Sequence, residues 1–196
     1  GPSEVIILAD ESADPEKAAR DWMIEAEHGP DSAALLVTHS RELVDKVIPI
    51  MNAQLEKLSD KRRSFIETNF TTYGGIILTE SLEESIKFVN DYAPEHMEVM
   101  TKNPFDTLPL IKNAGEILLG DYTPVTLCNF VLGPNAILPT GGFAKTYSSV
   151  SVMDFLKRSS VGYASKEGFN KVRDYAYKFA TVEGFETHAL AVKERD

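Results

Sequence analysis

Val5-Ile6-Ile7-Leu8-Ala9 is an uninterrupted apolar run with the length of one β-strand. A strand that is apolar at every position is typical of a sheet covered on both faces, because neither side of it is left for water. Asp14-Pro15 then has the pattern of a helix N-cap and first helical residue, and Gly29 stands where a helix of about four turns would end. This stretch predicts the first strand and crossover helix of a parallel sheet.

The same succession of strand and helix continues downstream. Apolar runs predict further strands, and between them lie helical patterns, one of which is opened by a capping box at Ser81 and Glu84. The expected strands are 33–37, 75–78, 96–100 and 116–119, and the expected helices are 40–58, 81–92 and 108–111. Regular alternation favours an α/β fold, here an incomplete doubly wound, Rossmann-like parallel sheet over residues 1–140.

The chain changes character after Gly120. Residues 120–150 are rich in Pro, Gly, Thr and Ser, and such long loops are usually functional or disordered. Helical patterns return at 152–158 and 169–179, with Gly184 as a break. We therefore expect residues 141–196 to form a loop and a helical tail. Because the apolar stripes of the tail need a surface to cover, we expect its last dozen residues to pack on a second subunit as a swapped element.

Composition narrows the possible functions. Thirty acidic and twenty basic residues give a formal net charge of −10, which disfavours binding to nucleic acids and to anionic membranes. One cysteine, Cys128, excludes an internal disulfide and suits a reducing compartment. The sequence contains no apolar run long enough to span a bilayer and no signal-peptide pattern. We expect a soluble, cytoplasmic protein.

Two short clusters pair a carboxylate with an imidazole. Glu25 and His28 are three apart on an expected helix, so they could converge on one metal ion or simply form a solvated helix end. Glu95 and His96 follow Pro94, where His96 could accept a proton and Glu95 could activate a water, although on a regular strand the two would point to opposite faces. These residues predict an α/β domain with a metal-assisted acid/base site.

Two other features have plainer readings. Cys128 stands among Leu127, Phe130 and Val131, which favours a small buried hydrophobe over a nucleophile. Gly141-Gly142 could cradle an anion, but the strand and helix of a phosphate-binding motif do not flank it.

Several motifs in order resemble the histidinol dehydrogenase family, over essentially the whole chain. The resemblance corresponds to roughly the second half of a typical family member, and the half that supplies most contacts to the nicotinamide cofactor is not part of it. The motifs are Gly1-Pro2-Ser3-Glu4-Val5, Ala26-Glu27-His28-Gly29-Pro30-Asp31-Ser32, Ala93-Pro94-Glu95-His96, Asn113-Ala114-Gly115, Gly133-Pro134-Asn135, Leu138-Pro139-Thr140-Gly141-Gly142, Asp154-Phe155-Leu156-Lys157-Arg158 and the segment Glu183 to His188.

The resemblance implies a chemistry. Family members oxidise an alcohol through an aldehyde to a carboxylate in two NAD-dependent steps. One zinc ion holds the substrate, and the family enzymes are homodimers. Carried over by position, His96 resembles the general base and Glu95 its partner in activating water, while Ser3 and Glu183 match substrate contacts. The zinc positions are Glu25, His28, Asn129 and His188, the last of which comes from the other subunit in the family.

Three departures from the family pattern bear on the substrate. The usual glutamine and aspartate zinc ligands are here Glu25 and Asn129, so the two oxygen ligands exchange their charge and the total stays at minus one. We expect zinc still to bind. A histidine that usually contacts the substrate is Ala136. Together with the string Thr123 to Ala136, this resembles paralogues that oxidise sulfopropanediol, so we expect a small polar alcohol other than histidinol.

An alternative from a different class stays open. The chain could be a binding or assembly module that keeps the fold without catalysis, and as an isolated part of a dehydrogenase it could be inactive. The sequence identifies no residue that binds NAD. Zinc content separates the readings, because a catalytic part should retain about one ion per site and an assembly module need not.

Overall fold

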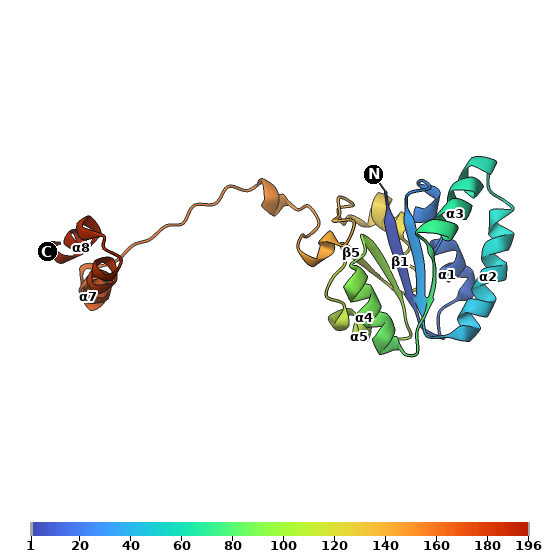
Figure 1. Ribbon diagram of the computed structural model, residues 1–196, viewed down its shortest axis with the longest axis horizontal. Helices are drawn as coiled ribbons and strands as arrows, with labels where there is room; N and C mark the ends of the chain where they lie inside the picture. Colours follow the sequence, from blue (N-terminus) through green and yellow to red (C-terminus); the bar gives the residue numbers. More distant parts are fainter. Residues whose placement is uncertain (1, 196) are drawn as a thin grey trace. The chain divides into compact units, whose positions relative to one another are not determined.

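The computed structural model describes residues 2–195. The larger unit, which extends to Phe155, is built on a parallel five-stranded sheet with the strand order β3-β2-β1-β4-β5 (Figure 1). The strands are β1 (Glu4–Ala9), β2 (Ala33–Thr38), β3 (Gly75–Leu78), β4 (His96–Met100) and β5 (Glu116–Leu119). The order reverses between β1 and β4, as in open doubly wound sheets. The expected fold class is confirmed.

The apolar run of β1 is buried on both sides. Ile7 and Ala9 belong to one hydrophobic core, and Ile6 and Leu8 belong to the other. Alternate side chains of a strand point to opposite faces, so a strand in the middle of a covered sheet must be apolar at every position. The sequence of β1 thereby accounts for its central place.

Helices cover both faces of this sheet (Figure 1). On one side lie α1 (Pro15–Asp21), α2 (Arg41–Leu55) and α3 (Asp60–Thr72), and on the other lie α4 (Leu82–Tyr92), α5 (Pro104–Thr107) and the 3₁₀ turn η2 (Leu108–Leu110). The side chains of Asp14, Ser40, Ser59 and Ser81 each accept a hydrogen bond from the first turn of the helix that follows. Such caps satisfy N–H groups that have no partner inside the helix.

The helix expected after Asp14 is shorter than its sequence pattern. α1 ends at Asp21, and the chain continues through turns into the 3₁₀ helix η1 (Glu25–Glu27). The backbone N–H groups of Met23 and Ile24 bond three residues back, and the buried Trp22 donates through Nε1 to the Ala34 carbonyl at 3.0 Å. These tertiary contacts override local helix propensity, so the expectation of about four turns was wrong.

The long segment after β5 contains short elements only. They are α6 (Val125–Leu127), the π-helical turn η3 (Cys128–Leu132) and the 3₁₀ turns η4 (Phe143–Lys145) and η5 (Val152–Phe155). The helix expected over 152–158 is reduced to η5, and residues 156–165 form neither helix nor strand.

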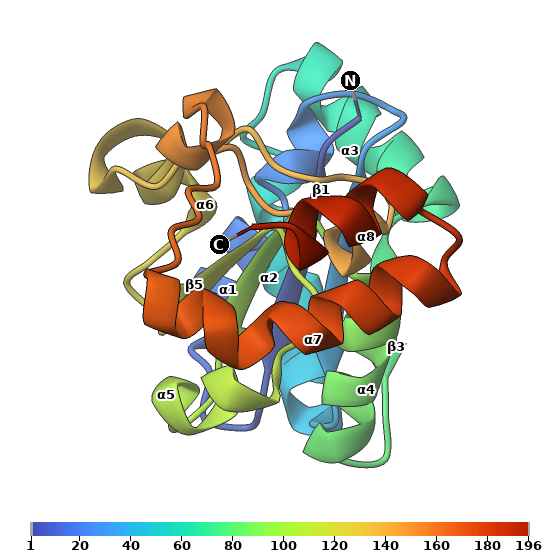
Figure 2. The ribbon, with the colours of Figure 1, turned by 90° about the vertical axis from the view of Figure 1, so that its left-hand side faces the viewer.

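The smaller unit begins at Leu156 and contains α7 (Lys166–Val182) and α8 (Glu186–Lys193), which pack side by side (Figure 2). Gly184 separates them with a φ of 75°, and the Arg173 guanidinium donates to the Lys193 carbonyl at 2.8 Å. The compact units divide after Phe155, whereas the predicted boundary lies at residue 140. Swapping of the tail between subunits stays a prediction.

Among residues 2–195, no helix combines the length and the apolar character needed to cross a membrane.

Candidate active site

Most of the predicted site residues gather at the amino-terminal edge of the sheet. Ser3 precedes β1, Glu95 precedes β4, His96 is the first residue of β4, and η1, which carries Glu25, lies before β2. Parallel strands all begin at the same edge, which explains how residues far apart in sequence meet. Ligands of open α/β sheets usually bind at the opposite, carboxyl-terminal edge, so this placement departs from the common pattern.

The hydroxyl of Ser3 bridges two carboxylates. Ser3 Oγ contacts Glu25 Oε2 and lies 3.2 Å from Glu95 Oε2. A hydroxyl has one proton to donate, so it serves one of the two carboxylates at a time. The Glu4 backbone N–H also donates to Glu95 Oε2, at 2.9 Å. Two predicted functional carboxylates therefore share one small polar centre.

Glu25 is held beside His28. Glu25 is the first residue of the 3₁₀ turn η1 and His28 is its C-cap, three positions later, with His28 Nε2 3.3 Å from Glu25 Oε2. The Glu25 side chain is 1% exposed and that of His28 is 56% exposed. Oε1 of Glu25 is buried without a hydrogen-bond partner. An unpaired buried carboxylate oxygen is costly, and a bound cation would satisfy it.

A strained turn presents Glu95 and His96. Ala93 ends α4 in the left-handed conformation, with φ 60° and ψ 66°, and it is fully buried. Non-glycine residues in this conformation cost free energy and tend to occur at functional sites. Gly115 lies against the same turn, and a Cβ atom there would stand 2.7 Å from the Glu95 carbonyl oxygen. The glycine of the Asn113-Ala114-Gly115 motif thus permits the close approach of the segment before β5 to the turn before β4.

His96 forms a buried pair with Glu116. Its Nδ1 lies 2.9 Å from Glu116 Oε2, and the two side chains are 5% and 6% exposed. Burial lowers the pKa of His96, but the hydrogen bond to Glu116 and the negative charges of Glu25, Glu95 and Glu116 outweigh it, so the pKa is raised overall. Burial raises the pKa of Glu116, and its hydrogen bonds with His96 and Cys128 outweigh that effect and lower the pKa.

The buried thiol of Cys128 donates to the other carboxylate oxygen of Glu116. Burial raises the pKa of Cys128 to about 12, and the neighbouring Glu116 contributes in the same direction. The thiol therefore stays protonated near neutral pH. A nucleophilic cysteine needs the thiolate, so these observations agree with the expected structural role.

The predicted zinc residues are divided between the two units. Asn129 lies in η3 next to Cys128, and its Oδ1 is buried without a hydrogen-bond partner. Glu183 caps α7 and His188 lies in α8, both exposed and in the smaller unit. Within residues 2–195 no three His, Cys, Asp or Glu side chains are grouped to hold a metal ion. The larger unit contributes only Glu25 and His28 of those types, together with the Asn129 amide.

Sequence reasoning missed a further acidic pair, in which Glu98 is buried and Asp21 is half-buried. Glu98 in β4 accepts a 2.8 Å hydrogen bond from the Val125 N–H, and its carboxyl lies beside that of Asp21. Burial raises the pKa of Glu98 well above its usual value, and the charge of Asp21 adds to this effect. Burial also raises the pKa of Asp21, to about 6. The available signal was a glutamate in the middle of an otherwise apolar strand.

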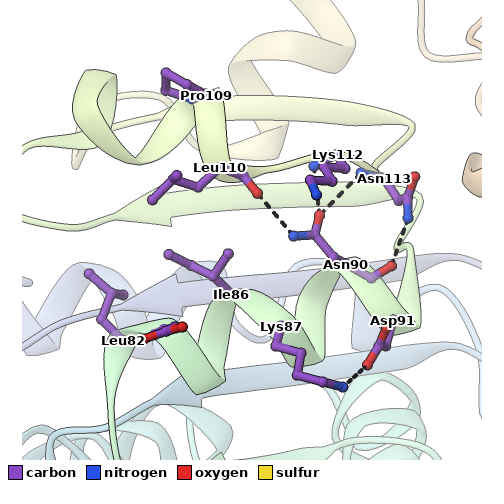
Figure 3. Close-up of a pocket in the computed structure, with 10 residues that line it drawn as sticks. Leu82, Ile86, Lys87, Asn90, Asp91, Pro109, Leu110, Lys112 and Asn113 are labelled. Atoms are coloured by element: carbon purple, nitrogen blue, oxygen red, sulfur yellow. Dashed lines mark hydrogen bonds and ion pairs between the residues drawn. The ribbon is translucent and has the colours of Figure 1, made fainter.

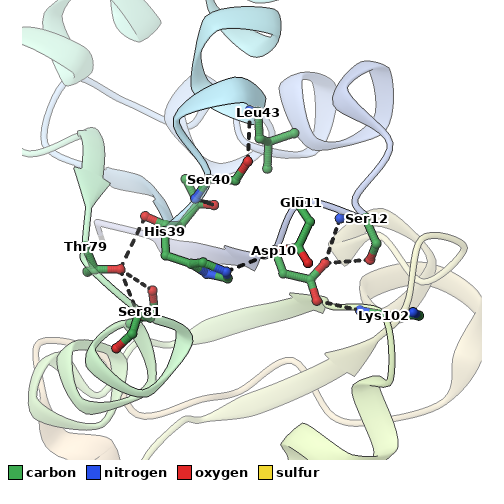
Figure 4. A network of polar contacts seen from close by, with 11 residues as sticks. Asp10, Glu11, Ser12, His39, Ser40, Leu43, Thr79, Ser81 and Lys102 are labelled. Carbon is green, nitrogen blue, oxygen red and sulfur yellow. Dashed lines mark hydrogen bonds and ion pairs between the residues drawn. The ribbon is translucent and has the colours of Figure 1, made fainter.

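The carboxyl-terminal edge carries a different polar network (Figure 4). Asp10 follows β1 at the reversal of strand order, and its carboxylate accepts from the backbone N–H groups of Ser12 and Lys102 at 2.9 and 2.8 Å. A phosphate bound in this crevice would use such donors. A side-chain carboxylate already occupies these two donors, so they are not free to bind a phosphate. Gly141 is similar, since its N–H donates to the Glu4 carboxylate at 3.2 Å.

A groove of about 790 Å³ lies between α4 and η2 (Figure 3). Several of its polar groups are paired with one another. Asn90 Oδ1 accepts from the Lys112 N–H at 2.6 Å, Asn90 Nδ2 donates to the Leu110 carbonyl at 3.0 Å, and Lys87 pairs with Asp91. Asn113 donates through Nδ2 to the Asn90 carbonyl at 2.9 Å. This groove contains none of the predicted site residues.

Comparisons with known proteins agree with the motifs. The sequence family described as "Histidinol dehydrogenase" matches residues 1–196. The chain is 54% identical over 196 residues to the histidinol dehydrogenase of Synechocystis sp., covering 100% of this chain and 45% of that protein. It is 51% identical over 195 residues to "Histidinol dehydrogenase homolog 2" of Mesorhizobium japonicum, covering 99% and 44%.

A solved structure supports the same assignment. The crystal structure of histidinol dehydrogenase from Elizabethkingia anophelis matches with a TM-score of 0.93 and 33% identity, over 98% of this chain and 44% of that one. The chain thus spans less than half the length of these relatives. The matching sequence, sheet and motif residues show that it belongs to the histidinol dehydrogenase family of oxidoreductases.

Proposed function

We propose that this chain forms the acid/base and metal-holding part of an NAD- and zinc-dependent dehydrogenase, which oxidises a small polar alcohol through the aldehyde to the carboxylate. The observation that carries the proposal is the meeting of Ser3, Glu25 and Glu95 at one polar centre beside a buried histidine. A general base and a water-activating carboxylate are the groups that this oxidation requires from the protein.

Each residue has a defined task in this proposal. His96 accepts the hydroxyl proton of the alcohol, and Glu95 takes a proton from the water that adds to the aldehyde. Ser3 and Glu183 hold polar groups of the substrate. When bound, NAD accepts a hydride in each of the two oxidations, and zinc polarises the substrate oxygen.

The residues of the larger unit fit a zinc ion. Glu25 Oε1 and Asn129 Oδ1 are both buried without a hydrogen-bond partner, and the His28 imidazole lies beside the Glu25 carboxylate. Nitrogen and carboxylate oxygen are common zinc donors. Glu25, His28 and Asn129 would hold the ion from one subunit. His188 of a second copy would complete the set, so we also propose a homodimer, working in the cytoplasm.

We propose sulfopropanediol rather than histidinol as the substrate. Ala136 stands where the family usually has a histidine that contacts substrate, and a methyl group cannot form that hydrogen bond. A site that has lost a polar contact binds the group that needed it less well. The exchange of charge between Glu25 and Asn129 further distinguishes this pocket from the usual one.

The test is NAD reduction by the longest natural polypeptide that contains this chain, with sulfopropanediol and histidinol compared at equal concentrations. We expect NADH to form with the sulfonate and to be negligible with histidinol. Robust turnover of histidinol would refute the substrate assignment. Absence of both turnover and bound zinc would favour the non-catalytic assembly module.

A further inference from the structure

Glu116 and His96 occupy matching positions on neighbouring strands. His96 begins β4, Glu116 begins β5, and the parallel register pairs them directly. The register also pairs His96 with Val5 of β1, so the backbone of His96 is fixed from both sides. The contact between imidazole and carboxylate is therefore a product of the sheet itself rather than of a mobile loop.

Both oxygens of the Glu116 carboxylate have partners. Oε2 lies 2.9 Å from His96 Nδ1, and Oε1 accepts from the thiol of Cys128. A carboxylate with a donor on each oxygen cannot rotate without breaking one of the two bonds. The buried glutamates Glu25 and Glu98 differ from Glu116, because each of them has one carboxylate oxygen without a hydrogen-bond partner.

This geometry determines which nitrogen of His96 carries a proton. A carboxylate only accepts hydrogen bonds, so the Nδ1 facing Glu116 must bear hydrogen, and in the neutral ring Nε2 then has the free electron pair. A fixed tautomer matters because a general base must present its unprotonated nitrogen to the substrate.

We propose that Glu116 is a positioning residue that holds His96 in the Nδ1–H tautomer, with Nε2 as the proton acceptor, and that Cys128 locks Glu116 in this role. The proposal rests on the proposed function for its catalytic meaning, but the tautomer itself is a property of this chain. Glu116 touches neither substrate nor cofactor and acts through His96.

Nitrogen-15 NMR of the histidine-labelled chain tests the tautomer directly. The four histidines give few signals, and His96→Gln assigns the relevant ones. We expect the neutral His96 ring to show a protonated Nδ1 and an unprotonated Nε2. The charged groups that face the His96 ring are Glu25 from η1, Glu95 from the preceding turn and Glu116 from β5. Because all three act on the ring, the effect of Glu116 is obtained by comparing the titration midpoint of His96 between the wild type and the Glu116 variants.

Two variants at Glu116 separate charge from hydrogen bonding. Glu116→Gln removes the negative charge beside the imidazole, so we expect a lower titration midpoint for His96, whereas Glu116→Ala should release the tautomer preference. Cys128→Ala removes the donor to Glu116 Oε1, so we expect the preference for the Nδ1–H tautomer to weaken without being lost. If Glu116→Ala fails to fold, the tautomer of His96 in the wild type and its titration midpoint in Glu116→Gln still test the proposal.

An Nε2–H tautomer in the wild type, or a His96 midpoint unchanged in Glu116→Gln, would overturn the proposal. The histidine signals of His28 and His188 serve as internal controls. Since no turnover is measured, this failure would leave the proposed oxidation untouched. Conversely, a confirmed tautomer in a protein that reduces no NAD would leave only the positioning role.

Discussion

The hydroxyl of Ser3 lies 3.2 Å from Oε2 of Glu95, although 92 residues separate the two in the chain. The same oxygen accepts the Glu4 N–H at 2.9 Å. One carboxylate oxygen therefore gathers donors from the start of β1 and fixes the turn that leads into β4. Glu95 is held in place by the protein before any substrate binds, which is the preorganisation that acid/base catalysis needs.

Replacing Glu95 by Gln should separate folding from chemistry. The amide oxygen can accept the same two hydrogen bonds, so we expect the free energy of unfolding to change by less than about 1 kcal/mol. Without a carboxylate to take a proton from water, acid formation from the aldehyde should fall by about 10²–10⁴-fold, and alcohol oxidation should fall less. Separate assays with alcohol and aldehyde, alongside urea denaturation, measure these effects. Unchanged acid formation would show that the assignment is wrong.

Exchanging the two oxygen ligands tests the zinc site. Glu25→Gln removes the only anionic ligand, so zinc affinity should fall by at least about tenfold. Adding Asn129→Asp to this variant should restore most of the affinity, because the total ligand charge returns to minus one. Competition with a chromophoric chelator measures both.

Glu27→Gln is the matched control, since Glu27 shares η1 with Glu25 but is not in the predicted ligand set. Its zinc affinity should equal that of the wild type. If Glu25→Gln and Glu27→Gln lost zinc affinity equally, the loss would be due to a general charge effect instead of coordination.

Much of this fold could be predicted from the sequence, because burial imposes a visible pattern. The strands 75–78, 96–100 and 116–119 have the predicted bounds, since a sheet covered on both faces leaves apolar runs. The helix after Asp14 was predicted too long, because the hydrogen bond from buried Trp22 to the Ala34 carbonyl joins residues whose proximity no local pattern records.

The site was predicted in part for a similar reason. Ser3, Glu25 and Glu95 stood out in short motifs, and the structure brings them together. Glu116 was missed because a glutamate at the start of a strand looks like an ordinary solvated end. Only the parallel register, which pairs it with His96, shows that it is buried against an imidazole. Register is a long-range property, and single-sequence periodicity does not specify it.

The pair of half-buried Asp21 and buried Glu98 should make stability depend on pH. The pKa of Asp21 is raised to about 6 in the folded chain, so between its ordinary value of 3.8 and about 6 the folded state binds more protons than the unfolded state. Stability therefore decreases as pH rises through this window, because the unfolded state loses its proton at a lower pH than the folded state. The raised pKa of Glu98 extends the decrease to higher pH.

Glu98→Gln resembles the protonated acid and can still accept the Val125 N–H. We expect this variant to be more stable than the wild type at pH 8 and to lose less stability between pH 4 and 8. Urea denaturation across this range gives the comparison. Parallel curves for the two proteins would exclude the pair as the source of the pH dependence.

Ala136→His should move substrate preference towards histidinol. The imidazole would restore a polar contact, and one hydrogen bond of this kind is worth about 1–3 kcal/mol, or roughly 5- to 150-fold in kcat/KM. Ala136→Gln is a control for side-chain bulk. The ratio of kcat/KM for histidinol to that for sulfopropanediol is the measurement, and a ratio unaffected by histidine would remove Ala136 from the specificity argument.

His96 is bonded into the sheet between β1 and β5, whereas Ala136 lies in residues 133–140, which form neither helix nor strand. Mutations near the imidazole disturb a shared framework, but mutations around Ala136 alter little beyond their own surroundings. Substitutions in the loop around Ala136 can therefore change the surroundings of that residue while the pairing of His96 with its neighbouring strands is kept.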